Sequence, residues 1–118
     1  MNTLKYDRIH QLEDLFRKKI SEIILKKVRD KRFINMNIVD VKLSSDLLNA
    51  RVYFRMLDTS NLPNQKNYEK FASMIRHEVS SSIDLKRMPK LTFILDTSIE
   101  NARHIEDLLN LKWKMESS

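Results

Sequence analysis

The sequence predicts a two-layer α+β domain, in which helices cover one face of a three-stranded sheet. Apolar residues recur at three- and four-residue steps in three stretches and alternate with polar residues in three others. Each alternating stretch has one strongly apolar face, which requires helical cover on one side only. A length of 118 residues with 42% hydrophobic residues suits one domain with one core.

The first helix is expected over residues 7–28. Its apolar stripe consists of Ile9, Leu12, Phe16, Ile20, Ile23 and Ile24. The stripe ends at the cation-rich segment KKVRDKR (26–32), which suits the negative end of a helix dipole.

Two strands are expected next, over residues 36–43 and 50–56. The connection SSDLLN (44–49) contains turn-forming residues and no glycine, so the strands are expected to form an antiparallel hairpin. The apolar face of the first strand is expected to carry Val39, Val41 and Leu43. In the second strand, the apolar face carries Ala50, Val52, Phe54 and Met56, and the opposite face carries Arg51, Tyr53 and Arg55.

A second helical stretch is expected after the polar loop 57–65. Its apolar residues are Tyr68, Phe71, Ala72, Ile75, Val79 and Ile83. Ser73 and the serine run 80–82 weaken helix propensity and mark where the helix can bend or break. A third strand follows Pro89 over residues 90–96, and Thr97-x-x-Glu100 is a capping-box pattern that begins a final helix. The single domain spans 1–118, with a core at about 7–110 and a flexible tail at 111–118.

The composition excludes several kinds of catalytic site. The chain has no glycine and no cysteine, so P-loops, dinucleotide fingerprints, nucleophile elbows, disulfides and thiolate zinc sites are excluded. His10, His77 and His104 lack partners at metal-ligand spacing. We therefore expect no metal, no cofactor and no enzymatic activity. No apolar run reaches the length of a membrane span and the first residues lack a signal-peptide pattern, so a cytoplasmic location is expected.

Positive charge is concentrated in the two long helical regions. The net charge is +6, and residues 1–32 carry ten Lys/Arg against five Asp/Glu. Residues 63–90 carry six against three, whereas residues 91–118 are acidic, with three against five. This asymmetry suggests a polyanionic partner such as nucleic acid. The alternative is that basic helices simply present solvated faces.

Three ordered strings resemble the ribosome-binding factor A family of bacterial small-subunit assembly factors. They are RDKRFINMNIVDVKLSSDLLNARVYFRML (29–57), ASMIRHEV (72–79) and LKRMPKLTFILDTSIENARHIEDLL (85–109). Lys31 stands where the family typically has the proline of an Asp-Pro-Arg turn. The resemblance implies a type II KH-like fold, in the order α-β-β-α(kink)α-β plus a C-terminal helix. It also implies an Ala-x-Gly interhelical kink in place of the GxxG loop of standard KH domains. Here that kink falls on Phe71, Ala72 and Ser73.

The resemblance also implies a function. The family binds free or nascent 30S subunits, contacts small-subunit rRNA near the 5′-end helix and the neck, and supports late 30S maturation, rRNA processing and cold adaptation. A ribosome-associated GTPase would release it, and it would act as a monomer. Two other functions stay open: a protein-interaction adaptor whose acidic last segment docks a basic partner, and a generic single-stranded RNA-binding module.

Candidate RNA-binding residues are cations that could neutralise phosphates, and aromatic or arginine planes that could stack on bases. The candidates are Lys26, Lys27, Lys31, Arg32, Arg51, Tyr53, Arg55, Arg76, Lys86, Arg87 and Lys90. For Arg51 and Arg55, the alternative is cross-strand pairing with Asp40. Trp113 could stack on a base or pack at the end of the chain. Reversing the charges of Arg76, Lys86 and Arg87 together is expected to weaken subunit binding and to leave the fold intact.

Overall fold

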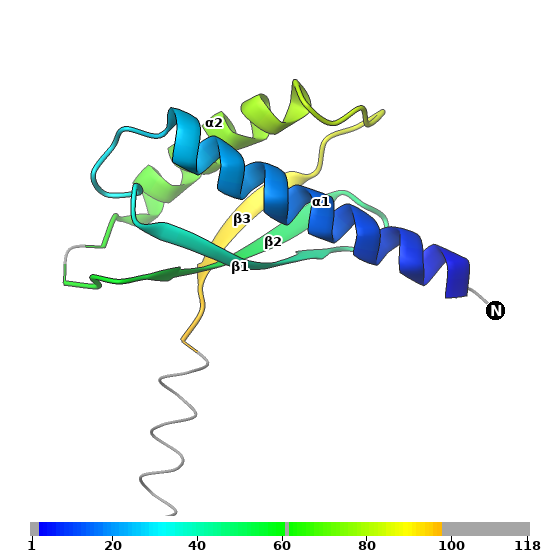
Figure 1. Ribbon diagram of the computed structural model, residues 1–118, viewed down its shortest axis with the longest axis horizontal. Coiled ribbons are helices and arrows are strands. Elements are labelled where there is room, and N and C mark those ends of the chain that lie inside the picture. Colours follow the sequence, from blue (N-terminus) through cyan, green and yellow to red (C-terminus); the bar gives the residue numbers. More distant parts are fainter. Residues whose placement is uncertain (1–2, 61, 98–118) are drawn as a thin grey trace, which may run out of the picture.

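The described residues form two helices and a three-stranded sheet, with both helices on one face of the sheet (Figure 1). The computed structural model describes residues 3–60 and 62–97. The elements are α1 (Thr3–Lys27), β1 (Met36–Leu43), β2 (Asn49–Met56), α2 (Gln65–Ser80) and β3 (Lys90–Leu95). This arrangement confirms the two-layer α+β prediction. The expected final helix lies outside the described residues, as do His104 and Trp113. No helix in the described part is both long and apolar enough to cross a membrane.

The strands are ordered β1-β2-β3. β1 and β2 are antiparallel, which confirms the predicted hairpin, and α2 is the crossover that makes β2 and β3 parallel. The register of β1 shifts between Ile38 and Asp40, so Val39 is an extra residue in a β-bulge. The prediction that Val39 shares a face with Val41 was therefore wrong: Ile38 and Val41 are buried, while Val39 is half-buried.

The hairpin turn shows how a chain without glycine makes a tight connection. Leu47 has a φ of 60°, in the left-handed region that favours glycine. The turn is held by Ser44 and Asp46: the Ser44 hydroxyl donates to Asp46 Oδ1 at 2.6 Å, and the same oxygen accepts from the Leu48 N–H at 3.0 Å. These side-chain hydrogen bonds hold the backbone in its strained conformation.

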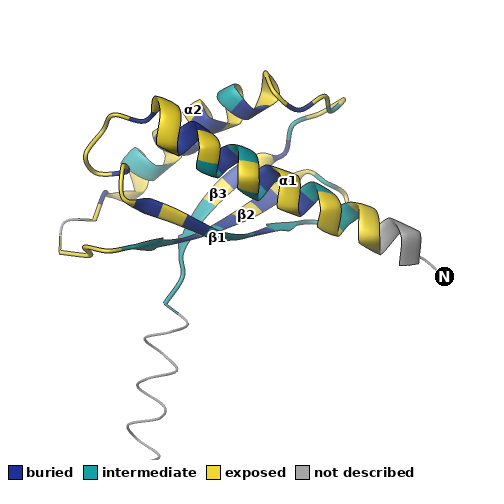
Figure 2. Cartoon of the chain, in the orientation of Figure 1, coloured by how far each residue is buried: buried dark blue, intermediate teal, exposed yellow. Residues whose placement is uncertain are grey.

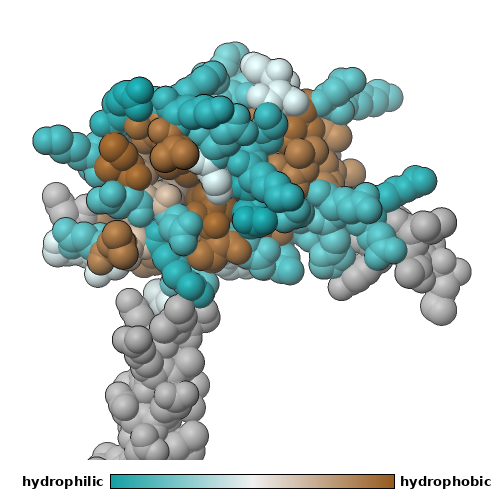
Figure 3. Space-filling model, in the orientation of Figure 1, coloured by the Kyte–Doolittle hydropathy of each residue, from teal (hydrophilic) through white to brown (hydrophobic). Residues whose placement is uncertain are grey.

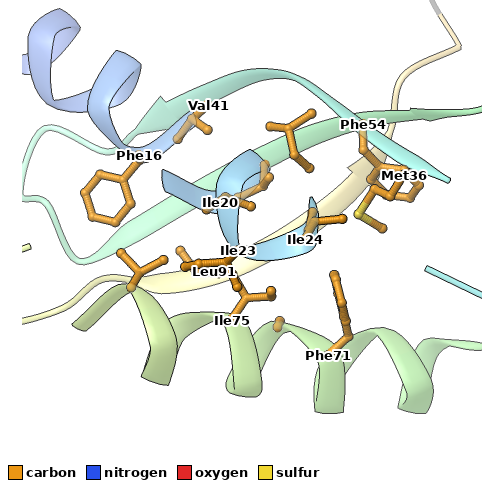
Figure 4. Close-up of a cluster of buried hydrophobic side chains, with 14 of the residues drawn as sticks. Phe16, Ile20, Ile23, Ile24, Met36, Val41, Phe54, Phe71, Ile75 and Leu91 are labelled. Atoms are coloured by element: carbon orange, nitrogen blue, oxygen red, sulfur yellow. The ribbon is translucent and has the colours of Figure 1, made fainter. Parts of the chain in front are cut away.

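The core lies between the helices and the sheet, where buried residues line the facing surfaces (Figure 2). α1 contributes Phe16 and Ile20, α2 contributes Ile75, and the central strand β2 contributes Phe54, all almost fully buried (Figure 4). Each such side chain contributes roughly 1.5–3 kcal/mol through burial. The helical periodicity of α1 and the alternation of β2 thus predicted the core correctly.

A buried carboxylate attaches α1 to β1. Glu13 is 8% exposed, and its Oε2 accepts a hydrogen bond from the backbone N–H of Leu43 at 2.7 Å. Its Oε1 lies 3.3 Å from Nδ1 of His10. A buried carboxylate is tolerated here because it is hydrogen-bonded.

α2 runs as one α-helix through Phe71, Ala72 and Ser73, so the helix is not broken at these residues. The kink that the resemblance implies there stays a prediction. Phe71 stacks on Phe33 of the α1–β1 connection, with ring centroids 4.1 Å apart and planes 3° apart. Phe71 and Ala72 are buried, and only Ser73 of this trio is exposed. Asn64 caps the start of α2 by accepting from the Asn67 N–H at 2.9 Å. The serine run 80–82 marks the end of the helix.

Candidate nucleic-acid interface

A groove of about 630 Å³ lies between α2 and β3. Its lining from α2 includes Ala72, Ser73 and Arg76, and its lining from β3 is the consecutive run Lys90–Phe93. Successive strand residues point to opposite faces, so a run of four means that the groove follows the edge of β3. β3 is paired only with β2 in the described sheet, and its outer edge offers backbone donors and acceptors.

The groove contains four of the residues predicted from the sequence: Ala72, Ser73, Arg76 and Lys90. Gln65, Tyr68 and Glu69, also on α2, complete much of the wall and were missed. Their three- and four-residue spacing from Ala72 and Arg76 places them on the same helix face. That spacing in the sequence could have identified them as residues of the groove. Burial raises the pKa of the Tyr68 hydroxyl. A tyrosine hydroxyl is protonated at neutral pH in any case, so Tyr68 can donate a hydrogen bond.

Arg76 stabilises the wall of this groove. Its Nε donates to the carbonyl oxygen of Pro89 at 3.0 Å, and a terminal nitrogen donates to the carbonyl oxygen of Met88 at 2.8 Å. These bonds connect α2 to the segment that enters β3. A guanidinium has five N–H donors, so Arg76 keeps capacity for a phosphate. Reversing its charge would remove both bonds, so we expect the triple reversal with Lys86 and Arg87 to lower stability where α2 meets β3.

A smaller pocket of about 240 Å³ lies where the α1–β1 connection meets α2. We call it the lateral pocket. It is lined by Lys27, Val28, Arg29, Asp30, Arg32, Phe33, Asn67, Lys70, Phe71 and Met74. It gathers two of the predicted cations, Lys27 and Arg32. Sequence reasoning missed Arg29 and Lys70 as site residues, although Arg29 belongs to the recognised KKVRDKR cluster.

Both predicted cations of the lateral pocket are already paired. The Lys27 ammonium binds the carboxylate of Glu78 on α2. Arg32 donates from its side chain to both Asp30 carboxylate oxygens, at 3.1 and 2.7 Å. The side chain of Arg32, and then its backbone N–H, lower the pKa of Asp30 to about 2. The Asp30–Arg32 pair therefore shapes the α1–β1 turn.

Four more of the predicted cations are exposed on α1 and in the loops: Lys26, Lys31, Lys86 and Arg87. Lys26 is paired with Glu22 at 2.9 Å. Lys31, Lys86, Arg87 and Lys90 form no ion pair within the described ranges. Lys86 and Arg87 lie in the loop that leads to Lys90 at the groove. Figure 3 shows hydrophilic side chains over much of the helical layer, with hydrophobic side chains among them.

The structure does not bring Arg51, Tyr53 and Arg55 to α2. They alternate with buried Val52 and Phe54, so they lie on the sheet face that faces away from the helices. Arg51 lies 5.9 Å from the Tyr53 ring centroid, and Arg55 is 3.3 Å from Asp96, just after β3.

The alternative pairing of these arginines with Asp40 is not what the structure shows. Asp40 instead contacts Lys42 at 3.6 Å. Nε of Arg55 is buried without an acceptor among the described atoms.

The fold and groove define a class of protein: a KH-like α+β domain, with the groove beside α2 and the edge strand. Within this class, the chain belongs to the ribosome-binding factor A family, whose model matches residues 8–109. A Latilactobacillus sakei ribosome-binding factor A is 36% identical over 107 residues, covering 86% of this chain and 89% of that protein. The Coxiella burnetii protein of that name is 32% identical over 112 residues, 94% of each chain.

Solved structures agree on the fold. The crystal structure of ribosome-binding factor A from Thermus thermophilus superposes with a TM-score of 0.61 at 18% identity, covering 74% of this chain and 94% of that one. A Thermus thermophilus homology model fitted into a cryo-EM map of a complex with the 30S subunit gives 0.60 at 18% identity, covering 74% and 93%. The predicted KH-like fold is confirmed.

Proposed function

We propose that this protein binds free and nascent small ribosomal subunits through their rRNA and supports late maturation and rRNA processing, including during cold adaptation. Membership of the ribosome-binding factor A family is the observation that carries this proposal. The related Thermus thermophilus protein fitted into a map of its 30S complex supports the choice of partner. We assign the protein no catalytic role.

The groove between α2 and β3 is the surface that we assign to RNA. Lys90, the first residue of β3, lies in its wall. Lys86 and Arg87 lie in the loop before it and form no ion pair within the described part. Unpaired cations can replace the counterions of phosphates without first breaking a protein ion pair. The edge of β3 and the side chains of α2 supply hydrogen-bonding groups for an unstacked strand.

Further details of the proposal follow from the family. The contacts would lie near the 5′-end helix and the neck of the small subunit, and a ribosome-associated GTPase would release the protein. It would act as a cytoplasmic monomer. Arg51, Tyr53 and Arg55, on the far face of the sheet, would then contact a second RNA segment rather than the one in the groove.

Depletion and complementation in the source organism test this function. Loss of the protein should cause precursors of small-subunit rRNA to accumulate, more strongly in the cold. A variant with Lys86, Arg87 and Lys90 changed to alanine should restore maturation poorly. A control with Arg8 and Lys18 changed to alanine, both exposed on α1, should restore it fully. Normal rRNA processing after depletion would reject the proposed function.

A further inference from the structure

The lateral pocket has an apolar floor beneath a cationic rim. Phe33 and Phe71 are 3% and 5% exposed, so their stacked rings form a rigid base, and Val28 is buried beside them. Met74 is 38% exposed and lines the same pocket. An exposed methionine next to such a base offers a polarisable, adaptable thioether for contact with an aromatic ring.

The rim carries more positive charge than its ion pairs neutralise. Lys27 and Arg32 are paired with Glu78 and Asp30. Arg29 and Lys70 line the pocket but have no ion pair with any residue that the structure describes. Asp30 is the only carboxylate among the lining residues, and it is bound to Arg32. An anion is therefore the ligand that this rim complements.

One polar side chain faces the pocket with its hydrogen-bonding capacity available. The backbone N–H of Asn67 is used to cap α2, but no side-chain hydrogen bond of Asn67 is present within the described structure. An amide both donates and accepts, which matches the edge of a nucleobase. The volume of about 240 Å³ is below the roughly 300–1,000 Å³ of ordinary ligand pockets. It suits one flat ring rather than two.

We propose that the lateral pocket binds one unpaired nucleotide of RNA. The base would lie over Met74 with its edge at Asn67, and its phosphates would lie between Arg29 and Lys70. This inference rests on the proposed RNA-binding function and adds a site on the flank of α2 away from the β3 groove. An acidic peptide could also satisfy the cations, but the apolar floor and the amide favour a nucleobase.

Methyl NMR of the intact protein tests the base-binding part. The probes are pentauridylate and a five-unit abasic ribose–phosphate chain, which has the same phosphates and no bases. The Met74 methyl resonance should shift on addition of pentauridylate and should shift much less with the abasic chain, because only a base reaches the floor. Equal shifts with both probes, or no shift with either, would overturn the proposal.

Variants test the phosphate part. Changing Arg29 and Lys70 to alanine should reduce the salt dependence of pentauridylate binding by about 1.4 in the log–log slope, about 0.7 for each phosphate that is no longer neutralised. Arg8→Ala with Lys18→Ala removes the same charge far from the pocket and should leave the slope unchanged. Met74→Glu should weaken binding at least tenfold, whereas Met74→Leu should keep it.

The failure of this inference differs from the failure of the proposed function. If the unmodified protein binds small subunits but the Met74→Glu and Arg29/Lys70 variants bind as tightly, the pocket assignment alone is wrong. If a heptaglutamate peptide shifts the Met74 methyl more than pentauridylate does, the pocket binds acidic peptides instead. If the unmodified protein binds no subunit, the proposed function itself fails.

Discussion

Replacing Phe71 with alanine should destabilise the domain strongly, although the resemblance places this residue at a functional kink. Phe71 is 5% exposed, stacks on Phe33 at 4.1 Å and lies 5.2 Å from the Phe93 ring centroid. Truncating a buried phenylalanine costs about 3–5 kcal/mol, because apolar surface is no longer buried and a cavity is left behind. Against a typical stability of roughly 5–15 kcal/mol, this cost is about a fifth of the total or more.

Urea denaturation followed by circular dichroism measures this cost. Phe71→Leu is the matched control: it keeps an apolar side chain and should lower the free energy of unfolding by about 1 kcal/mol, mainly through the missing aromatic stacking. Ser73→Gly should cost about 0.5 kcal/mol, because Ser73 is exposed inside a continuous helix and glycine has lower helix propensity than serine. A loss below about 1 kcal/mol for Phe71→Ala, or a gain for Ser73→Gly, would refute an uninterrupted α2 packed through Phe71.

Three further changes test other parts of the structure. Glu13→Ala should lower the free energy of unfolding by about 1–3 kcal/mol, because it leaves the Leu43 N–H without its acceptor; an unchanged urea midpoint would contradict the α1–β1 attachment. Leu47→Gly should raise the free energy of unfolding by up to about 1 kcal/mol by relieving the positive φ, and thermal unfolding measures it; a decrease would mean that the Leu47 side chain contributes more than the strain costs. The pKa of Asp30 falls from 3.8 to about 2 on folding, so its contribution is present above pH 3.8 and is lost as the pH falls towards 2. Asp30→Asn should therefore weaken the dependence of the free energy of unfolding on pH in that range. An unchanged pH dependence would show that the Asp30–Arg32 pair does not stabilise the fold.

The elements were predictable because their periodicity is set by burial on one face. α1, α2 and β2 each follow one period throughout, so their buried residues could be read directly. β1 could not be read in full because the bulge at Val39 changes the face halfway along the strand. The break expected near Ser73 followed from analogy and serine propensity, but packing of Phe71 on Phe33 overrides that weak local preference.

The candidate site was predictable only where neighbouring residues in the chain stay together in the fold. Lys90 and Arg76 meet at the groove, but the second role of Arg76 depends on where the Met88 and Pro89 carbonyls fall. Arg29 and Lys70 are distant in sequence and line one pocket only because the α1–β1 connection packs on α2. The spacing of neighbouring residues in the sequence therefore could not predict that these two cations lie at one site.

Binding to the small subunit through its rRNA can be measured by co-sedimentation with purified small and large ribosomal subunits across a series of salt concentrations. We expect selective binding to the small subunit that weakens as salt rises, with a shallower slope for the Lys86/Arg87/Lys90→Ala variant. Equal binding to both subunits would leave only a generic RNA-binding module. Binding that survives nuclease digestion of the rRNA and ignores salt would contradict RNA recognition and favour a protein-interaction adaptor.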